Sequence, residues 1–164
     1  MFDPRSENQL GSRDTPQDIE SHAAAVSPRQ RLRCKAIPVL KSKHGTLRQL
    51  EPGDAVSLAR LLGTAEIQEF QPTAPTTPHA FSHYIRWTRR QERIGRHLSF
   101  GVVPHGLRSA VGVFQIWPIE SQFWTAEWGF ALGRPYWGTG LFLESAEQVV
   151  DYAIQTLGVH RLEA

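Results

Sequence analysis

The chain has 164 residues, of which 40% are hydrophobic and 21% charged, and its formal net charge at pH 7 is only +2. These values are ordinary for a globular domain, and they exclude a fibrous or wholly disordered chain. No apolar run approaches the roughly 20 residues of a membrane-spanning helix, and the polar N-terminus has no signal segment. A single cysteine, Cys34, excludes a disulfide framework within the chain and a multi-cysteine metal site. We therefore predict a cytoplasmic protein that holds no metal and has no membrane partner.

The N-terminal part of the chain has the composition of an extension to the folded domain. Residues 1–44 are rich in serine, glutamine, proline and charge and have no sustained period, so we predict a disordered basic segment without stable tertiary contacts. Between Ser21 and Leu50 there are seven lysines and arginines and no acidic residue. Because no aromatic residue interleaves with these charges, a solvated arm is favoured over a nucleic-acid-binding tail.

The first predicted elements are a strand and a helix. Residues 46–50 alternate in polarity as a short strand does. Pro52 and Asp54 then mark a helix start, because proline suits the first helical position and an acidic residue suits the first turn. Apolar residues at helical spacing give this helix one buried face, and Gly63 ends it.

A proline-rich loop separates this helix from the next. Residues 71–78 contain three prolines, which is typical of a loop. Apolar residues then recur at i, i+3, i+4 and i+7 from Phe81, and this spacing predicts a helix that ends near Gly95. The other side of the helix carries four arginines, which we interpret as a solvated face.

Three strands, a helix and a last strand follow in the sequence. Residues 98–103 and 110–116 flank a Pro-His-Gly turn and are predicted to pair as a hairpin, with 126–132 as the third strand. Apolar residues at helical spacing over 143–157 predict a helix of about five turns. A glycine ends that helix, and residues 160–164 begin another strand.

The order of these elements predicts the fold class. A meander of hairpin strands followed by one strand–helix–strand crossover is typical of an α+β fold with a mixed sheet. We expect a mostly antiparallel sheet flanked by helices. A doubly wound parallel sheet is excluded, because strands and helices do not alternate along the whole chain.

The turn between the third of these strands and the long helix carries Gly138 and Gly140. A glycine turn at a helix start presents unpaired N–H groups to an anion such as a phosphate, although it can also serve only to reverse the chain. A P-loop would need Lys-Ser or Lys-Thr where Leu141 and Phe142 stand, and a dinucleotide fingerprint would need glycine in place of Leu143. A pyrophosphate-binding turn of the coenzyme A type needs neither the lysine pair nor the third glycine.

Three motifs occur in this region in a fixed order. They are A-E-x-G-[YF]-x-L at Ala126–Leu132, Y-W-G-x-G at Tyr136–Gly140 and L-G-x-x-R-[LV]-E-A at Leu157–Ala164. With these motifs, residues 46–164 resemble the GNAT superfamily of acetyl-CoA-dependent N-acetyltransferases, especially the branch that acetylates the N-termini of ribosomal proteins. Residues 47–50 and 111–113 match the first and third strands of that family.

The resemblance implies a set of cofactor-binding residues. Backbone groups of Phe130, Ala131 and Leu132 would pair with the pantetheine arm of acetyl-CoA, and one of their N–H groups would bind the thioester oxygen. N–H groups of the turn would surround the pyrophosphate, and Arg134 would reach a phosphate. The turn residues concerned are Trp137, Gly138, Thr139, Gly140 and Leu141.

The chain departs from the family in two places. The family often has glutamine or arginine three residues before the first turn glycine, where this chain has Pro135, with Arg134 one position earlier. The family also continues past its fifth strand into another helix and two further strands, which supply a coenzyme A contact and often a tyrosine that protonates the leaving thiolate. The resemblance therefore implies a domain over residues 45–164 that is C-terminally incomplete.

Glu127 is the candidate general base, because it is the acidic residue on the strand that lines the acceptor cleft in the family. A carboxylate among tryptophans is suited to accepting a proton at neutral pH, although Glu127 could equally be a structural residue paired with a neighbour. The tryptophans concerned are Trp117, Trp124 and Trp128. Glu120 is the substitute, whereas His97 and His105 are expected at the surface and Glu144 is expected to be structural.

Two functions of different class stay open from the sequence. The first is an N-acetyltransferase that acts on a protein N-terminus or a small amine, with acetyl-CoA as co-substrate and no nucleic acid partner. The second is a catalytically weak or inactive remnant that binds coenzyme A only or acts through a partner; the open sheet edge that it would have allows a homodimer. A weaker third is an RNA-associated module, which rests only on the basic residues at 29–48.

Overall fold

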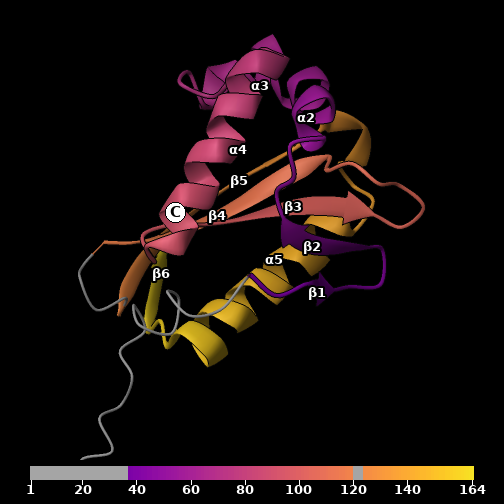
Figure 1. Ribbon diagram of the computed structural model, residues 1–164. Coiled ribbons are helices and arrows are strands. Elements are labelled where there is room, and N and C mark those ends of the chain that lie inside the picture. The colour runs from indigo at the N-terminus through magenta and orange to yellow at the C-terminus, as the bar shows by residue number, and fades with distance from the viewer. Residues whose placement is uncertain (1–36, 120–123) are drawn as a thin grey trace, which may run out of the picture.

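The computed structural model describes residues 37–119 and 124–164, which form one six-stranded sheet with helices on both faces (Figure 1). The strands are β1 (Leu40–Lys41), β2 (Gly45–Gln49), β3 (Leu98–Pro104), β4 (Gly112–Pro118), β5 (Thr125–Leu132) and β6 (Arg161–Glu163). The helices are α2 (Asp54–Leu62), α3 (Ala65–Phe70), α4 (Pro78–Arg93), the short 3-10 turn η1 (Arg134–Tyr136), α5 (Leu141–Asp151) and the π-helical turn η2 (Tyr152–Leu157). The α+β fold with a mixed sheet is confirmed.

The strands lie in the sheet in the order in which they occur in the chain. Each neighbouring pair is antiparallel except β5 and β6, which are parallel because α5 and η2 cross between them. The parallel pairing joins only Thr125–Glu127 to Arg161–Glu163. In the described residues, the segment Trp128–Leu132 of β5 therefore has a strand on one side only, which is β4.

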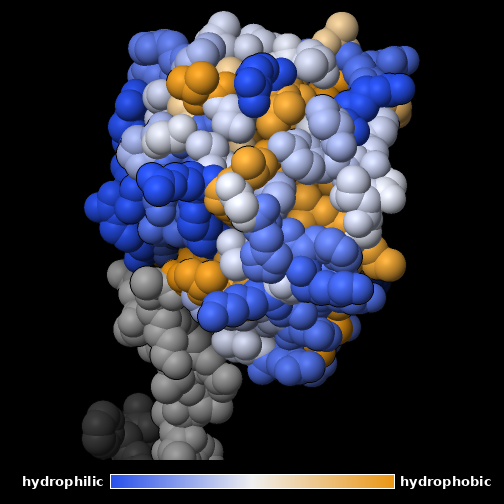
Figure 2. All heavy atoms as spheres, turned by 90° about the vertical axis from the view of Figure 1, so that its right-hand side faces the viewer, coloured by the Kyte–Doolittle hydropathy of each residue, from blue (hydrophilic) through white to orange (hydrophobic). Residues whose placement is uncertain are grey.

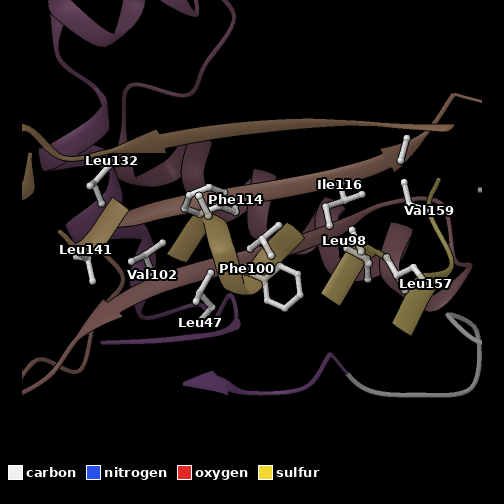
Figure 3. Packing of buried hydrophobic residues seen from close by; sticks show 14 of the residues in the cluster. Leu47, Leu98, Phe100, Val102, Phe114, Ile116, Leu132, Leu141, Leu157 and Val159 are labelled. Carbon is white, nitrogen blue, oxygen red and sulfur yellow. The ribbon is translucent and has the colours of Figure 1, made fainter. Parts of the chain in front are cut away.

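Two hydrophobic cores cover the two faces of the sheet. Alternation along β3 sends Leu98, Phe100 and Val102 toward α5 and η2, where Figure 3 shows them packed with Leu141 and Leu157. The opposite face packs against α2 and α4 through a second cluster. Its members include Val103, Val113 and Ala131 of the sheet and Leu58, Phe81 and Ile85 of the helices.

The folded domain begins earlier than the sequence analysis expected. Leu40 of β1 pairs with Leu47 of β2, and Ile37 and Leu40 pack against the core beneath α5. The predicted boundary at residue 44 is therefore wrong for residues 37–44, because a two-residue strand is too short to show a period in the sequence. Residues 1–36 lie outside the described part of the chain, so the rest of the predicted disordered segment stays a prediction.

The helices also differ from the expectation. Helix α3 was missed because Ile67 is its only buried residue, so it has no repeating apolar face. The long helix keeps α-helical geometry only to Asp151 and continues as the π-helical turn η2. Gly158 then ends it with a left-handed φ of 73°, as predicted. Strand β4 begins at Gly112, two residues later than predicted.

A buried ion pair fixes the start of α2. Asp54 is 1% exposed, and its two carboxylate oxygens accept hydrogen bonds from Arg48 Nη1 and Nη2 at 2.8 and 2.9 Å. The same oxygens accept the backbone N–H groups of Glu51 and Ala110 at 2.8 and 2.9 Å. Burial alone would raise the pKa of Asp54, but these four hydrogen bonds outweigh burial and hold that pKa below its ordinary value.

The surface of the domain mixes polar and apolar residues. On the side drawn in Figure 2, hydrophobic residues lie in separate areas divided by hydrophilic ones. Within the described ranges, no helix combines the length and the apolar character needed to cross a membrane.

Candidate functional site

A cavity of about 370 Å³ lies beside the segment of β5 that has no strand on its outer side. Five of the residues predicted to bind the cofactor line it: Phe130, Ala131, Leu132, Trp137 and Gly138. Helix α3 forms the opposite wall with Ile67, Phe70 and, just after the helix, Gln71. We refer to this space as the first cavity. The fold thus brings the strand and the glycine turn of the sequence prediction to one place.

Side-chain donors occupy two backbone carbonyls of β5 at the edge of the first cavity. Gln71 Nε2 donates to the carbonyl of Phe130 at 3.0 Å, and Trp137 Nε1 donates to the carbonyl of Leu132 at 2.7 Å. Both carbonyls therefore point away from β4. Because the N–H and C=O of one residue point to the same side of a strand, the N–H groups of Phe130 and Leu132 also face the cavity.

Ala131 lines the first cavity, but its backbone N–H and C=O face β4. The N–H of Gly133 reaches the carbonyl of Val111 at 2.9 Å, so Gly133 faces the direction of β4. Alternation gives Ala131 the same direction, in register with Val113. The expectation that the backbone of Ala131 pairs with an extended ligand is therefore wrong, whereas Phe130 and Leu132 remain suited to that role.

The turn before α5 presents backbone N–H groups to the solvent side of the first cavity. Gly138 and Gly140 have left-handed φ angles of 71° and 85°, and a Cβ at Gly138 would meet no atom of the described residues within 4 Å beyond its chain neighbours. Thr139 closes the turn formed by Trp137 and Gly138, whereas among the described residues the N–H groups of Gly138 and Gly140 have no hydrogen-bond partner. They lie at the positive end of the α5 dipole, so the turn is suited to an anion.

Two of the predicted turn donors are already used within the protein. The backbone N–H of Trp137 donates to the carbonyl of Arg134 at 3.1 Å, and the N–H of Leu141 donates to Thr139 Oγ1 at 3.4 Å. The Thr139 hydroxyl itself donates to the carbonyl of Tyr136 at 2.8 Å. These bonds hold the turn in place and leave the N–H groups of Trp137 and Leu141 engaged within the protein.

Arg134 lies at the rim of the turn. Its guanidinium is ion-paired with Glu66 of α3 and lies 5.6 Å from the centre of the Trp137 ring. Its side chain is 70% exposed, and its two contacts are with α3 and with Trp137, both of which border the first cavity. The structure therefore places Arg134 near the predicted phosphate site despite the proline that follows it.

A histidine that the sequence analysis placed in the disordered segment lies against the same turn. The backbone N–H of His44 donates to Glu144 Oε2 at 3.0 Å, and His44 Nδ1 lies 2.6 Å from Glu144 Oε1. A Cβ at Gly140 would lie 3.8 Å from the His44 ring. Desolvation opposes the ionisation of Glu144, but the hydrogen bonds from His44 outweigh it and lower the pKa of Glu144. Glu144 therefore has the structural role expected of it, which is to hold the β1–β2 hairpin to α5.

A second cavity, of about 530 Å³, lies between α4, the loop at residues 71–75 and the face of β4 and β5 that packs against α2 and α4. Its walls include Phe81, Tyr84 and Trp87 of α4 and Trp117 of β4. The two cavities share four lining residues: Ile67, Phe70, Gln71 and Ala131. A group bound in one cavity therefore lies next to a group bound in the other.

Glu127 contacts the second cavity through one of the three tryptophans named with it. Trp117 Nε1 donates to Glu127 Oε2 at 3.1 Å, and the Trp117 ring lines the cavity. The expected contacts with the other two are wrong. Trp128 lies on the opposite face of the sheet, where it packs against Phe114, and Trp124 is 56% exposed and lies against His160.

The other ionisable candidates differ in their burial. His97 is 7% exposed, and burial lowers its pKa to about 4, so its ring is neutral at neutral pH. Glu92 was not singled out in the sequence, although it is buried and accepts hydrogen bonds from Gln49 Nε2 and the Ser99 N–H. Burial raises the pKa of Glu92. His105 is exposed as expected, and Glu120 lies outside the described residues.

Comparison with known proteins agrees with this geometry. The family model described as acetyltransferase (GNAT) domain matches residues 45–164. The chain is 26% identical over 120 residues to the uncharacterised N-acetyltransferase p20 of Bacillus licheniformis. The aligned region covers 73% of this chain and 67% of p20.

Solved structures share the fold at lower identity. Ribosomal-protein-S5-alanine acetyltransferase from Vibrio fischeri matches with a TM-score of 0.64 and 17% identity, over 77% of this chain and 72% of that one. RimJ from Mycobacterium smegmatis, in complex with CoA-disulfide, matches with a TM-score of 0.60 and 20% identity, over 72% of this chain and 60% of that one.

Proposed function

Because the chain belongs to the GNAT family of acetyltransferases, we propose that it moves the acetyl group of acetyl-CoA to a primary amine, either at a protein N-terminus or in a small molecule. The observation that carries this proposal is the contact between the two cavities, which share a wall at Gln71 and Ala131. Acetyl transfer needs a thioester and an amine held side by side, and two adjoining cavities supply that arrangement.

In this proposal the first cavity holds the coenzyme. The N–H groups of Gly138 and Gly140 bind the pyrophosphate, with Arg134 at the rim. The pantetheine arm lies along the outer edge of β5 as an added strand would, and it pairs with Phe130 and Leu132. One of the two outward N–H groups of β5 then binds the thioester oxygen, where negative charge develops during transfer.

The second cavity holds the amine. Its nitrogen attacks the carbonyl carbon of the thioester and forms the new C–N bond, and one N–H proton is relayed through water to the Glu127 carboxylate, which does not itself line the cavity. The C–S bond breaks, its electron pair stays on sulfur, and the thiolate takes a proton from solvent. Trp117 fixes the Glu127 carboxylate through the indole N–H, so that the base keeps one orientation.

Substitution of Gly138 tests the coenzyme site. We expect Gly138→Val to lower acetyl-CoA affinity by about 100-fold or more, because the side chain would take the phosphate position and each lost hydrogen bond to a charged group costs about 1.5–3 kcal/mol. Apart from Gly138 and its two chain neighbours, no described residue has a heavy atom within 4 Å of the new Cβ, so the fold should survive the strain that a left-handed φ imposes on valine. Calorimetric titration with acetyl-CoA measures the effect.

Gly106→Val is the matched control for backbone strain. Gly106 also has a left-handed φ, of 83°, and an added Cβ there would meet no described atom within 4 Å beyond its chain neighbours, but it lies in the β3–β4 turn and does not line the first cavity. Both variants should lose similar thermal stability, and only Gly138→Val should lose affinity. Equal acetyl-CoA affinity in Gly138→Val and the unchanged chain would contradict the pyrophosphate site.

Gln71 gives a second test, because its side chain competes for the edge of β5. We expect Gln71→Met to bind acetyl-CoA about 2–10-fold more tightly, since one intramolecular hydrogen bond, worth about 0.5–1.5 kcal/mol, no longer has to be broken. The control is Gln68→Met, which removes the bond from Gln68 Nε2 to the Ala74 carbonyl and leaves β5 unchanged. Equal affinities in the two variants would mean that Gln71 does not compete with the coenzyme.

A further inference from the structure

Resting on the proposed function, we propose that the second cavity selects an α-amine attached to a large apolar or aromatic side chain, and that it discriminates against the side-chain amine of lysine. The acceptor is then an N-terminal residue, or a small amine, of this type.

The aromatic wall of the second cavity supplies the first argument. Tyr84 and Trp87 stack with ring centres 6.4 Å apart and an angle of 27° between their planes. His97 links this pair to Trp117, because its centre lies 5.1 Å from Trp87 and it stacks on Trp117 at 5.6 Å and 8°. The rings therefore form one continuous row from α4 to β4. Such a row is suited to an apolar or aromatic group, which stacks on its faces and edges.

The charge of the wall supplies the second argument. Among the residues that the structure describes, the side chains that line the second cavity include no lysine, arginine or carboxylate, and their polar groups belong to uncharged residues such as Gln71, Thr73 and Gln115. Glu127 contacts this lining through Trp117. A polycationic acceptor would have to give up water without gaining an opposite charge, which is costly. The cavity therefore favours a ligand whose only ionisable group is the reacting amine.

The basicity of the amine supplies the third argument. An amine must be neutral to attack the thioester, and the described lining of the cavity offers the ammonium form no carboxylate in direct contact. With a typical α-amine pKa of about 7.7–8.0, roughly a third of the amine is neutral at pH 7.5, against about one part in a thousand for lysine at a pKa of about 10.4. An α-amine therefore enters the second cavity far more often in its reactive form.

The shared wall fixes the direction in which such an acceptor lies. The amine has to reach Gln71 and Ala131, where the first cavity begins. The side chain then extends toward Trp87 of α4 and Trp117 of β4, which also line the space. A glycine residue would leave this part of the 530 Å³ cavity unfilled. Burial of an aromatic side chain is worth about 10–100-fold in a rate or binding constant.

A panel of three amides tests the inference on the full chain with saturating acetyl-CoA at pH 7.5. Tryptophanamide offers an α-amine and a large ring, glycinamide an α-amine alone, and Nα-acetyllysinamide a side-chain amine alone. We expect kcat/KM, measured by thiol release, to be about 10–100-fold higher for tryptophanamide than for glycinamide. It should be at least about 100-fold higher than for Nα-acetyllysinamide. If turnover is too slow to measure, calorimetric binding of tryptophanamide and glycinamide decides between side chains in the same way.

Two tryptophan variants locate the effect. Trp87→Ala should lower kcat/KM, or the affinity, for tryptophanamide about 10-fold. The same quantity measured with glycinamide should change by no more than about 2-fold, and the affinity for acetyl-CoA should not change. Trp124→Ala, at a tryptophan that does not line the cavity, should change none of these values. Equal or preferred use of glycinamide or Nα-acetyllysinamide, with acetyl-CoA still bound, would overturn this inference alone. Failure of acetyl-CoA to bind at all would overturn the proposed function instead.

Discussion

Glu127→Gln is expected to lower the turnover number by about 10²–10⁴-fold and to leave acetyl-CoA affinity unchanged, because the change removes a general base and nothing that binds the coenzyme. The substitution is well matched to this position. A glutamine carbonyl can still accept the Trp117 indole N–H that Glu127 Oε2 accepts at 3.1 Å, so the tryptophan and the cavity wall should keep their places. Steady-state rates with tryptophanamide and a titration with acetyl-CoA measure the two quantities.

Trp117→Phe is the control that separates catalysis from positioning. It removes the hydrogen bond to Glu127 and keeps an aromatic ring against His97 and the second cavity. If Glu127 is the base, Trp117→Phe should lower the turnover number far less than Glu127→Gln does. Similar losses in both variants would make Glu127 a positioning residue. A loss below about 10-fold in Glu127→Gln would mean that the amine gives its proton to water before it reacts.

The sequence was sufficient to predict the elements with strong local patterns. Alternation predicted the central strands, and the helical spacing from Phe81 predicted α4. The two glycines before the long helix predicted the turn at Gly138 and Gly140. Both have left-handed φ angles in the structure, which glycine adopts more readily than other residues. The sequence did not show β1 or α3, since an element of two or six residues with few buried side chains has no period to detect.

Only those parts of the candidate site that consist of residues close together in the sequence could be predicted. The contacts that occupy the β5 carbonyls join Phe130 to Gln71, 59 residues away, and no local pattern contains such a pair. One error was avoidable. Successive residues of a strand point to opposite faces, so Trp128 could not have shared a face with Glu127. Its neighbour across the sheet, Trp117, depends on the register of β4 and β5, which the structure alone supplies.

Asp54→Ala is expected to destabilise the domain by about 3–5 kcal/mol, the usual cost of removing one partner from a buried ion pair. The change leaves Arg48, whose side chain is 16% exposed, without its main partner. It also leaves the N–H groups of Glu51 and Ala110 without the carboxylate that accepts them. The free energy of unfolding, from urea titration monitored by tryptophan fluorescence, measures the effect.

Glu51→Ala is the matched control for Asp54→Ala. Glu51 also faces Arg48, at 3.9 Å from its Nε, but its side chain is 63% exposed. Exposed ion pairs contribute about 0–1 kcal/mol, so this variant should change stability by no more than that amount. A loss in Asp54→Ala no larger than in Glu51→Ala would mean that the pair contributes little to the fold.

The pH dependence of the Asp54 effect follows from the direction of its pKa shift. The pKa of Asp54 is lower in the folded protein than in the unfolded chain, so the unfolded state binds the proton first as the pH falls. The stability that Asp54 supplies is therefore complete above the unfolded value of about 3.9 and is lost as the pH falls through the lower, folded value. The difference in unfolding free energy between the unchanged chain and Asp54→Ala should be constant from pH 6 to 8 and should narrow below about pH 4. A difference that instead widened in acid would contradict the assignment of Asp54 as an ionised partner of Arg48, because only a group with a raised pKa supplies more stability when it is protonated.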